Sequence, residues 1–247
     1  MRRFFQHLPL LLTGVIAVLC GCRHVDLSSV PLADDLGLVS VEPVPKEIVD
    51  RFGPTAKDRL AEISRQRAVA KKGPAKIRED ISSQLAEQIQ TEPNPFIRQE
   101  MIRTLTVCDT PTAGRILRAG LNDESIDVQI QCCRGWGQWG TKESVRVLQE
   151  VLDNRLTDLD VKIAAIDGIE ATGQLAGAKR LVSLLDPGEA PAIQYEAVQA
   201  LQKMTGQKLA NDREAWDLYV AEQIEKAGAE PSSRPPSLAE RALLWWR

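Results

Sequence analysis

The chain has 247 residues, of which 26% are charged and 4% aromatic, and its formal net charge is −3. A mildly acidic chain argues against nucleic acid as a partner, because phosphate binding depends on a clustered positive field. Its two histidines, His7 and His24, both precede the segments predicted below to fold, which excludes histidine-dependent nucleophilic, acid–base and metal chemistry from that domain.

Residues 1–21 have the composition of a signal peptide rather than of a folded element. Arg2 and Arg3 precede a largely apolar run over 10–19, and the sequence LCGC closes it at 19–22. This arrangement resembles a bacterial lipoprotein signal, in which small residues precede a cysteine that is lipidated and becomes the new N-terminus. That cysteine is Cys22 here. An uncleaved membrane anchor is the alternative, but the apolar run is shorter than the ~20 residues that a spanning helix needs.

The resemblance also implies a location. Arg23, rather than an aspartate, follows the lipidated cysteine, which favours the outer membrane with the protein facing the periplasm; the inner membrane is the alternative. Removing residues 1–21 takes away two arginines and no acids, so 29 Lys and Arg remain against 34 Asp and Glu, and the side-chain charge becomes −5. We therefore expect a lipid-anchored, mildly acidic mature protein.

Residues 22–54 are predicted to form an extended tether. They contain prolines at 31, 43, 45 and 54 and show no helical period. Such a segment would lift the following domain off the membrane.

Two helices are predicted within 55–92, one as far as Ala70 and one over 75–90, separated by the sequence KKGP. Apolar residues at helical spacing mark them: Leu60, Ile63 and Val69 in the first, and Ile77, Ile81, Leu85 and Ile89 in the second. We interpret the pair as a polar N-terminal cap, because a terminal repeat must keep its outer side soluble. A separate coiled-coil segment is the alternative, but helices this short do not sustain one.

An internal repeat of apolar residues organises residues 93–210. Its first buried position, here called the anchor, recurs 31, 33 and 32 residues apart at Ile97, Val128, Val161 and Ile193. Positions five and eight residues later share its helical face: Ile102, Cys133, Ile166 and Val198, then Leu105, Trp136, Ile169 and Leu201. A second helix follows in the first three units, marked by leucines 20 and 24 residues after the anchor: Leu117, Leu148 and Leu181, then Leu121, Leu152 and Leu185.

The ends of these helices are also marked. In the second, third and fourth units, a glycine closes the first helix, because a chain leaving a helix often needs a positive φ. These glycines are Gly140, Gly173 and Gly206. The first unit has Asp109 instead. Helix starts are predicted at Asn94, Thr110 and Thr141, whose side chains can cap the first turn.

The sequences VQIQCCRGWGQWG (128–140) and VKIAAIDGIEATG (161–173) resemble the first helix of the HEAT family in its short-repeat form. The resemblance implies an all-α fold, a right-handed α-solenoid of antiparallel helix pairs that offers an extended binding surface. It implies no chemistry by itself.

A capping helix is predicted over 211–226 after the array, with Trp216 sealing the last repeat. Residues 227–236 contain three prolines and are predicted to be a linker. A short amphipathic, Trp-rich helix over 237–247 follows, opening on a sequence that resembles a capping box. Trp245 and Trp246 at its end either fold back onto the solenoid or form an exposed hook for a partner or a membrane interface; the proline-bearing linker favours the hook.

No catalytic, cofactor-binding or metal site is predicted. Cys108, Cys132 and Cys133 occupy positions that are otherwise mostly apolar in the other units, so we interpret them as small buried residues. Neighbouring cysteines on a helix point about 100° apart, and Cys108 and Cys132 are separated by ~10 Å along roughly parallel axes, so disulfides are not expected. Three nearby glycines, at 135, 137 and 140, lie within a helical period and indicate close helix packing rather than a phosphate loop.

One surface feature is a candidate for binding. Arg115, Arg146 and Lys179 stand eighteen residues after the first three anchors, so stacked units would align them in what we call the basic row, with Arg118 beside it. By resemblance, second helices line the concave face, and an acidic partner could bind there. The alternative is a solvated face that Glu150, Asp153 and Asp186 neutralise locally.

The sequence thus predicts a membrane-anchored, non-enzymatic scaffold that binds another protein of the bacterial envelope through its solenoid surface. The alternative is an accessory subunit of an envelope enzyme or transporter complex, with a ligand site formed only in the complex; a structural spacer is a third hypothesis. The predicted site residues are Cys22 for lipidation and, for partner binding, Arg115, Arg118, Arg146, Lys179, Trp245 and Trp246.

Overall fold

Helices succeed one another through the part of the chain that the computed structural model describes, residues 53–229. They are α3 (Ala56–Lys72), α4 (Ala75–Gln88), α5 (Pro95–Cys108), α6 (Pro111–Gly120), α7 (Ile126–Trp139), α8 (Lys142–Asp153), α9 (Leu159–Thr172), α10 (Leu175–Ser183), α11 (Pro191–Thr205) and α12 (Arg213–Ala229). Residues 53–229 contain no strand. All ten helices belong to one unit that starts at Pro54.

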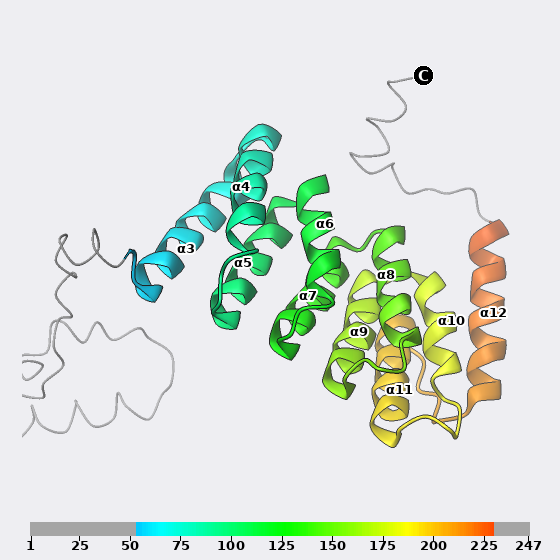
Figure 1. Cartoon of the computed structure of the whole chain (residues 1–247). Coiled ribbons are helices and arrows are strands. Elements are labelled where there is room, and N and C mark those ends of the chain that lie inside the picture. Colours follow the sequence, from blue (N-terminus) through cyan, green and yellow to red (C-terminus); the bar gives the residue numbers. More distant parts are fainter. Residues whose placement is uncertain (1–52, 230–247) are drawn as a thin grey trace, which may run out of the picture. The chain divides into compact units, whose positions relative to one another are not determined.

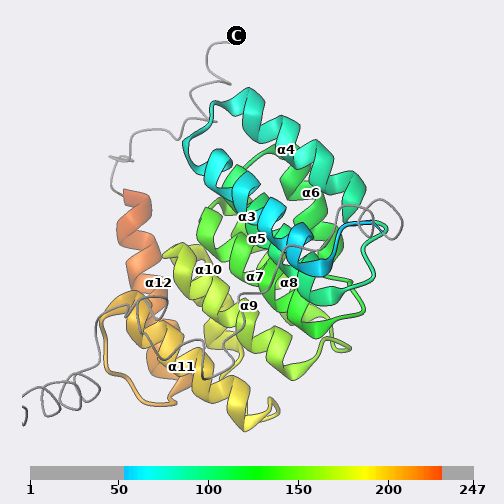
Figure 2. The same cartoon turned by 90° about the vertical axis from the view of Figure 1, so that its left-hand side faces the viewer.

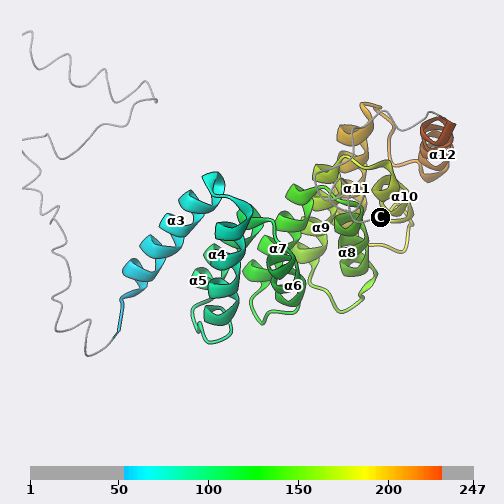
Figure 3. The same ribbon diagram turned by 90° about the horizontal axis from the view of Figure 1, so that it is seen from above.

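The helices form two layers, as expected for a solenoid of helix pairs (Figure 1). Helices α3, α5, α7, α9 and α11 each contact the next and make up the first layer. The second layer consists of α4, α6, α8, α10 and α12, and Figure 3 shows α6, α8, α10 and α12 on one side of α7, α9 and α11. Figure 2 views the same layers from the α3 end. The described fold is therefore an all-α, HEAT-like solenoid.

The predicted helix caps of the repeats are confirmed. Asn94 and Thr110 accept hydrogen bonds from the first turns of α5 and α6, and Thr141 forms a capping box with Ser144. At the other ends, the three predicted glycines adopt φ between 60° and 73°, and Asp109 has φ 49°. Aspartate tolerates this left-handed conformation better than most residues, which explains why the first unit can end its helix without glycine.

The repeat pattern identifies the core. The four anchors are at most 2% exposed, and the positions five and eight residues later are at most 8% exposed. Leu117, Leu148 and Leu181 in the second helices are 0% exposed. Leu121 is the exception among the second-helix leucines, because it is only partly buried at the end of α6.

Glycine allows α7 and α9 to approach closely. A Cβ atom on Gly137 would lie 2.7 Å from the Cα of Gly168, and a Cβ on Gly168 would lie 3.0 Å from the carbonyl oxygen of Cys133. A Cβ on Gly135 would collide with Thr106 and Leu117. The interpretation of these glycines as packing residues is confirmed for Gly135 and Gly137.

A buried arginine joins two loops at one edge of the array. Arg98 is 6% exposed and donates to the carbonyl oxygens of Glu92 and Pro93 at 3.0 and 3.1 Å. It also donates to both carboxylate oxygens of Asp123 at 2.9 and 2.7 Å, and this bonding raises the pKa of Arg98. The α4–α5 and α6–α7 loops are thus held together by one side chain whose charge is fully paired.

Residues 55–92 contain the two predicted helices, but two residues of the predicted apolar face are exposed. Val69 is 53% exposed and Ile77 37% exposed, while Ala70 is 2% exposed. Val69 and Ile77 lie beside the α3–α4 turn, since both border the Cβ position of Gly73. Both side chains are exposed because no helix within residues 53–229 packs against that side of α3 and α4.

Helix α12 takes the place of a second helix in the last unit, but it runs antiparallel to α10, the second helix of the preceding unit. The Asn211 side chain donates to Gln194, near the start of α11, and Arg213 pairs with Asp186, just after α10, each at 2.9 Å. The 206–212 loop therefore returns along α11, so α12 starts where α10 ends and lies antiparallel to it (Figure 1). Trp216 seals the contact as predicted, since it is 0% exposed and its Nε1 donates to Ala210 O at 3.0 Å. The helix extends to Ala229, three residues beyond the predicted end.

Candidate functional site

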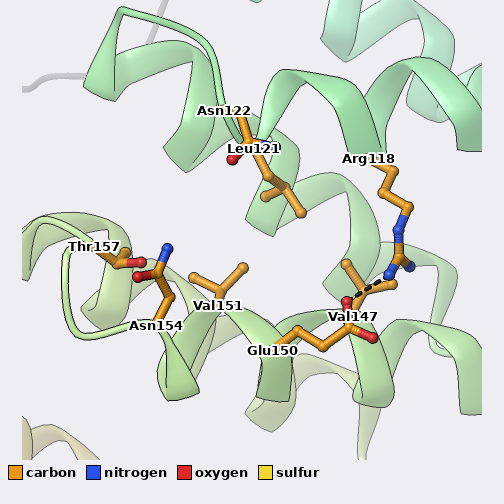
Figure 4. Close-up of a pocket in the computed structure, with 8 residues that line it drawn as sticks. All are labelled: Arg118, Leu121, Asn122, Val147, Glu150, Val151, Asn154 and Thr157. Carbon is orange, nitrogen blue, oxygen red and sulfur yellow. Dashed lines mark hydrogen bonds and ion pairs between the residues drawn. The ribbon is translucent and has the colours of Figure 1, made fainter.

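A groove opens in the second layer between α6 and α8 (Figure 4). These two helices are consecutive in the layer, yet they are not in close contact with each other, although each packs against α7. The space between them has a volume of about 280 Å³. Its lining residues are Arg118, Leu121, Asn122, Val147, Glu150, Val151, Asn154 and Thr157.

The groove has an apolar floor and a polar rim. Val147 and Val151 on α8 are 1% and 9% exposed, and the partly buried Leu121 faces them from the end of α6 (Figure 4). Asn122 and Asn154 are exposed at the rim, where the Asn154 side chain also accepts a hydrogen bond from Leu156 N at 3.0 Å. Amide side chains can both donate and accept hydrogen bonds, so this rim can pair with the backbone of another polypeptide.

Arg118 closes one end of the groove. It is bound by Glu150 and, at 3.2 Å, by Glu143, both on α8. All three side chains are between 43% and 48% exposed, so water and salt screen the pairs. Breaking the ion pairs between α6 and α8 therefore costs little free energy. Arg118 is one of the predicted partner-binding residues, and it lines the groove.

The basic row lies on the second layer, and its members differ in how they are neutralised. Arg146 pairs with Glu143 at 2.5 Å, and these hydrogen bonds raise the pKa of Arg146. Arg115 donates to the hydroxyl of Thr112 at 2.8 Å. Within residues 53–229, neither Arg115 nor the exposed Lys179 forms an ion pair with a carboxylate, so two of the three cations keep an unneutralised charge.

The predicted neutralising contacts were wrong in detail. Glu150 pairs with Arg118 rather than with Arg146, because Arg118 reaches across from α6. Asp153 pairs instead with Arg180, and Asp186 with Arg213, each at 2.9 Å. Spacing along one helix could not show these contacts, since each one joins two different helices or a helix and a loop.

The three cysteines of the described chain are buried thiols, as predicted. Cys108, Cys132 and Cys133 are 0% exposed and unpaired. Burial raises the pKa of Cys133 to about 12 and that of Cys132 well above its usual value. Thiolates are the reactive form of cysteine, so these residues serve packing rather than chemistry.

Other predicted site residues cannot be placed. Cys22, Trp245 and Trp246 lie outside the described residues. Between residues 53 and 229, no group of three or more His, Cys, Asp or Glu side chains is arranged to hold a metal ion. No helix in that part of the chain is both long and apolar enough to cross a membrane.

The groove itself is not predictable from the repeat pattern. That pattern places Arg118 on the surface and Leu121 in the core, and nothing in it distinguishes α6 from α8. The one available signal is length, because α6 has 10 residues and the opposing α8 has 12.

Comparison with known proteins agrees with the architecture. A family model described as HEAT repeats matches residues 115–202, from α6 to α11. No curated protein matches the chain. The matched part of the array is thus similar to HEAT repeats, which supports a helical-repeat scaffold.

Proposed function

We propose that this protein is a membrane-anchored, non-enzymatic scaffold of the bacterial envelope, whose HEAT-like array binds another envelope protein through its second layer. Similarity to HEAT repeats supports the scaffold, because stacked helix pairs present an extended surface to other macromolecules. The lipid on Cys22, the bacterial envelope and the outer-membrane location facing the periplasm rest on the sequence of residues 1–23.

The observation that carries the binding hypothesis is the groove between α6 and α8. Protein interfaces combine an apolar centre with a polar rim, and the floor formed by Val147 and Val151 with the rim formed by Asn122 and Asn154 has this arrangement. Arg115 lies one helical turn before Arg118, and Arg146 one turn before Glu150, so the basic row continues from the groove. We infer that an extended acidic segment of the partner lies across α6 and α8.

Charge reversal of the row tests this hypothesis. We expect Arg115→Glu, Arg146→Glu and Lys179→Glu together to reduce crosslinking to the partner in intact envelopes by about tenfold or more, which corresponds to ~1.4 kcal/mol of binding free energy. The measurement is crosslinking followed by mass spectrometry, with one protein expected in constant ratio to this chain.

A matched control reverses one exposed charge on the first layer. Arg134→Glu on α7 should leave the crosslink unchanged, since Arg134 is exposed away from the second layer. An undiminished crosslink in the triple variant would contradict the assignment of the binding surface. Turnover of a small molecule by the purified array would count against a non-enzymatic scaffold.

A further inference from the structure

The outward side of α12 carries an apolar strip that the described chain leaves open. Trp216 and Val220 face α10 and are 0% and 2% exposed. Leu218, Ala221 and Ile224 follow one another at every third residue, which places them in an oblique strip along the helix. Leu218 is 76% exposed and Ile224 39% exposed.

The first layer is open at the same end of the array. Tyr195 stands two residues after its anchor in α11 and is 62% exposed. Ile130 and Ile163 occupy this position in the two preceding units, where they are partly buried against the core. In those units another first-layer helix, α9 or α11, packs against the next side, whereas no first-layer helix follows α11 within residues 53–229.

We propose that residues 237–247 of the same chain dock on the strip formed by Leu218, Ala221 and Ile224, as a helix that runs back along α12. The occupant follows from where the described chain ends. Residues 230–236 reach at most ~25 Å when fully extended, and Leu218 lies 11 residues before Ala229, hence ~16 Å back along the axis of α12. The segment can therefore reach the strip without strain.

The spacing of apolar residues in the proposed helix over residues 237–247 matches the strip on α12. A helix that begins level with Ala229 and runs antiparallel to α12 brings Trp245 ~12 Å back along the axis, level with Ala221. Leu238, Ala242 and Trp245 are spaced four and three residues apart, so they share the face that meets α12. In this register the segment ends at Arg247, level with Tyr219, so Trp245 covers Ala221 and Ile224 and the end of the segment borders Leu218. Each buried tryptophan covers roughly 150–250 Å².

The charges beside the strip are complementary to those of the segment. Glu214 and Glu225 flank the strip on α12, and Asp217 beside them is already paired with Arg213, whereas the segment carries Arg241 and Arg247. In the antiparallel register, Arg241 lies ~6 Å back along the axis, level with Glu225. This arrangement favours docking over an exposed tryptophan hook.

Two variants of the full chain test the docking from its two sides. Trp245→Ala/Trp246→Ala removes the segment's apolar face, and Leu218→Asp places a charge in the strip. Each should speed amide hydrogen exchange over residues 217–226 by about tenfold or more, because loss of the cover lowers the local opening free energy. Leu218→Asp should also increase quenching of tryptophan fluorescence by acrylamide. The combined variant should exchange no faster than either alone, since both break one contact.

Leu156→Asp is the matched control, because Leu156 is 94% exposed in the α8–α9 loop; it should change neither readout. Far-ultraviolet circular dichroism checks that each variant keeps its helices. Unchanged exchange in both test variants would overturn the proposal, as would additive effects in the combined variant. Protection that depends on protein concentration and accompanies a doubled mass would also overturn it, since a second copy would then cover the strip.

Discussion

At the scale of single residues, glycine sets the distance between neighbouring units. Gly137 and Gly168 face each other where α7 crosses α9, and the gap leaves no room for a side chain on either. Gly114 on α6 is different, because a Cβ there would have its nearest neighbour at 3.7 Å, an ordinary van der Waals distance. Alanine substitutions at Gly137 and Gly114 therefore separate the free-energy cost of steric crowding from the intrinsic effect of replacing glycine in a helix.

We expect Gly137→Ala to lower the free energy of unfolding by about 1–3 kcal/mol, because the new methyl group would collide with backbone that cannot move aside locally. Gly114→Ala should instead raise it by about 0.5–1 kcal/mol, since alanine costs less backbone entropy in a helix. Urea unfolding followed by circular dichroism measures both. A stabilising Gly137→Ala would show that α7 and α9 are further apart than described.

At the scale of helices, the repeat period was sufficient to predict most of the array. Each anchor lies on a helix whose buried face continues five and eight residues later, so Val128 and Val161 could be assigned to the core from spacing alone. The caps were predictable for the same reason, because Thr141 and Gly140 act on their own helix and need no distant partner.

Features that depend on contacts between units could not be predicted in this way. The direction of α12 follows from contacts of Asn211 and Arg213 with residues seventeen and 27 positions earlier. The groove exists because α6 and α8 do not pack against each other, and the Arg118 side chain reaches across the space between them. At the N-terminal end, Val69 fits the helical period, but no described unit lies beside it to cover it. Each case is decided by tertiary packing, which a local pattern does not encode.

Trp216 is expected to hold α12 in its reversed direction. We predict that Trp216→Ala lowers the free energy of unfolding by about 3–5 kcal/mol, as for other buried aromatic residues replaced by alanine, and that α12 becomes the first site of proteolysis. Thermal unfolding and limited digestion with mass spectrometry measure the two effects. Leu156→Ala, at a site that is 94% exposed, should stay within about 0.5 kcal/mol of the parent protein. Intact α12 in a digested Trp216→Ala variant would contradict the role given to this side chain.

At the scale of the whole molecule, the array has two different ends. The α3–α4 pair starts it with a largely polar outer side, and the reversed α12 ends it, because a further first helix would have to start from the opposite edge of the layer. An extended helical surface suits the scaffold proposed above, and that proposal also requires an attachment to the membrane.

We propose that Cys22 provides the attachment, and its substitution tests the anchor independently of partner binding. In cells, Cys22→Ala should move the protein from the membrane fraction to the soluble fraction and abolish the mass added by lipid, because the other cysteine of the signal, Cys20, is preceded by Leu19 rather than by a small residue. A chain over residues 22–54 extends to at most ~110 Å, so the lipid need not constrain the array. Cys20→Ala is the matched control: it changes the neighbouring cysteine, keeps a small residue before Cys22, and should leave both location and mass as in the parent. Membrane-bound Cys22→Ala protein of unaltered mass would overturn the lipid anchor and favour an uncleaved apolar segment over residues 10–19 instead.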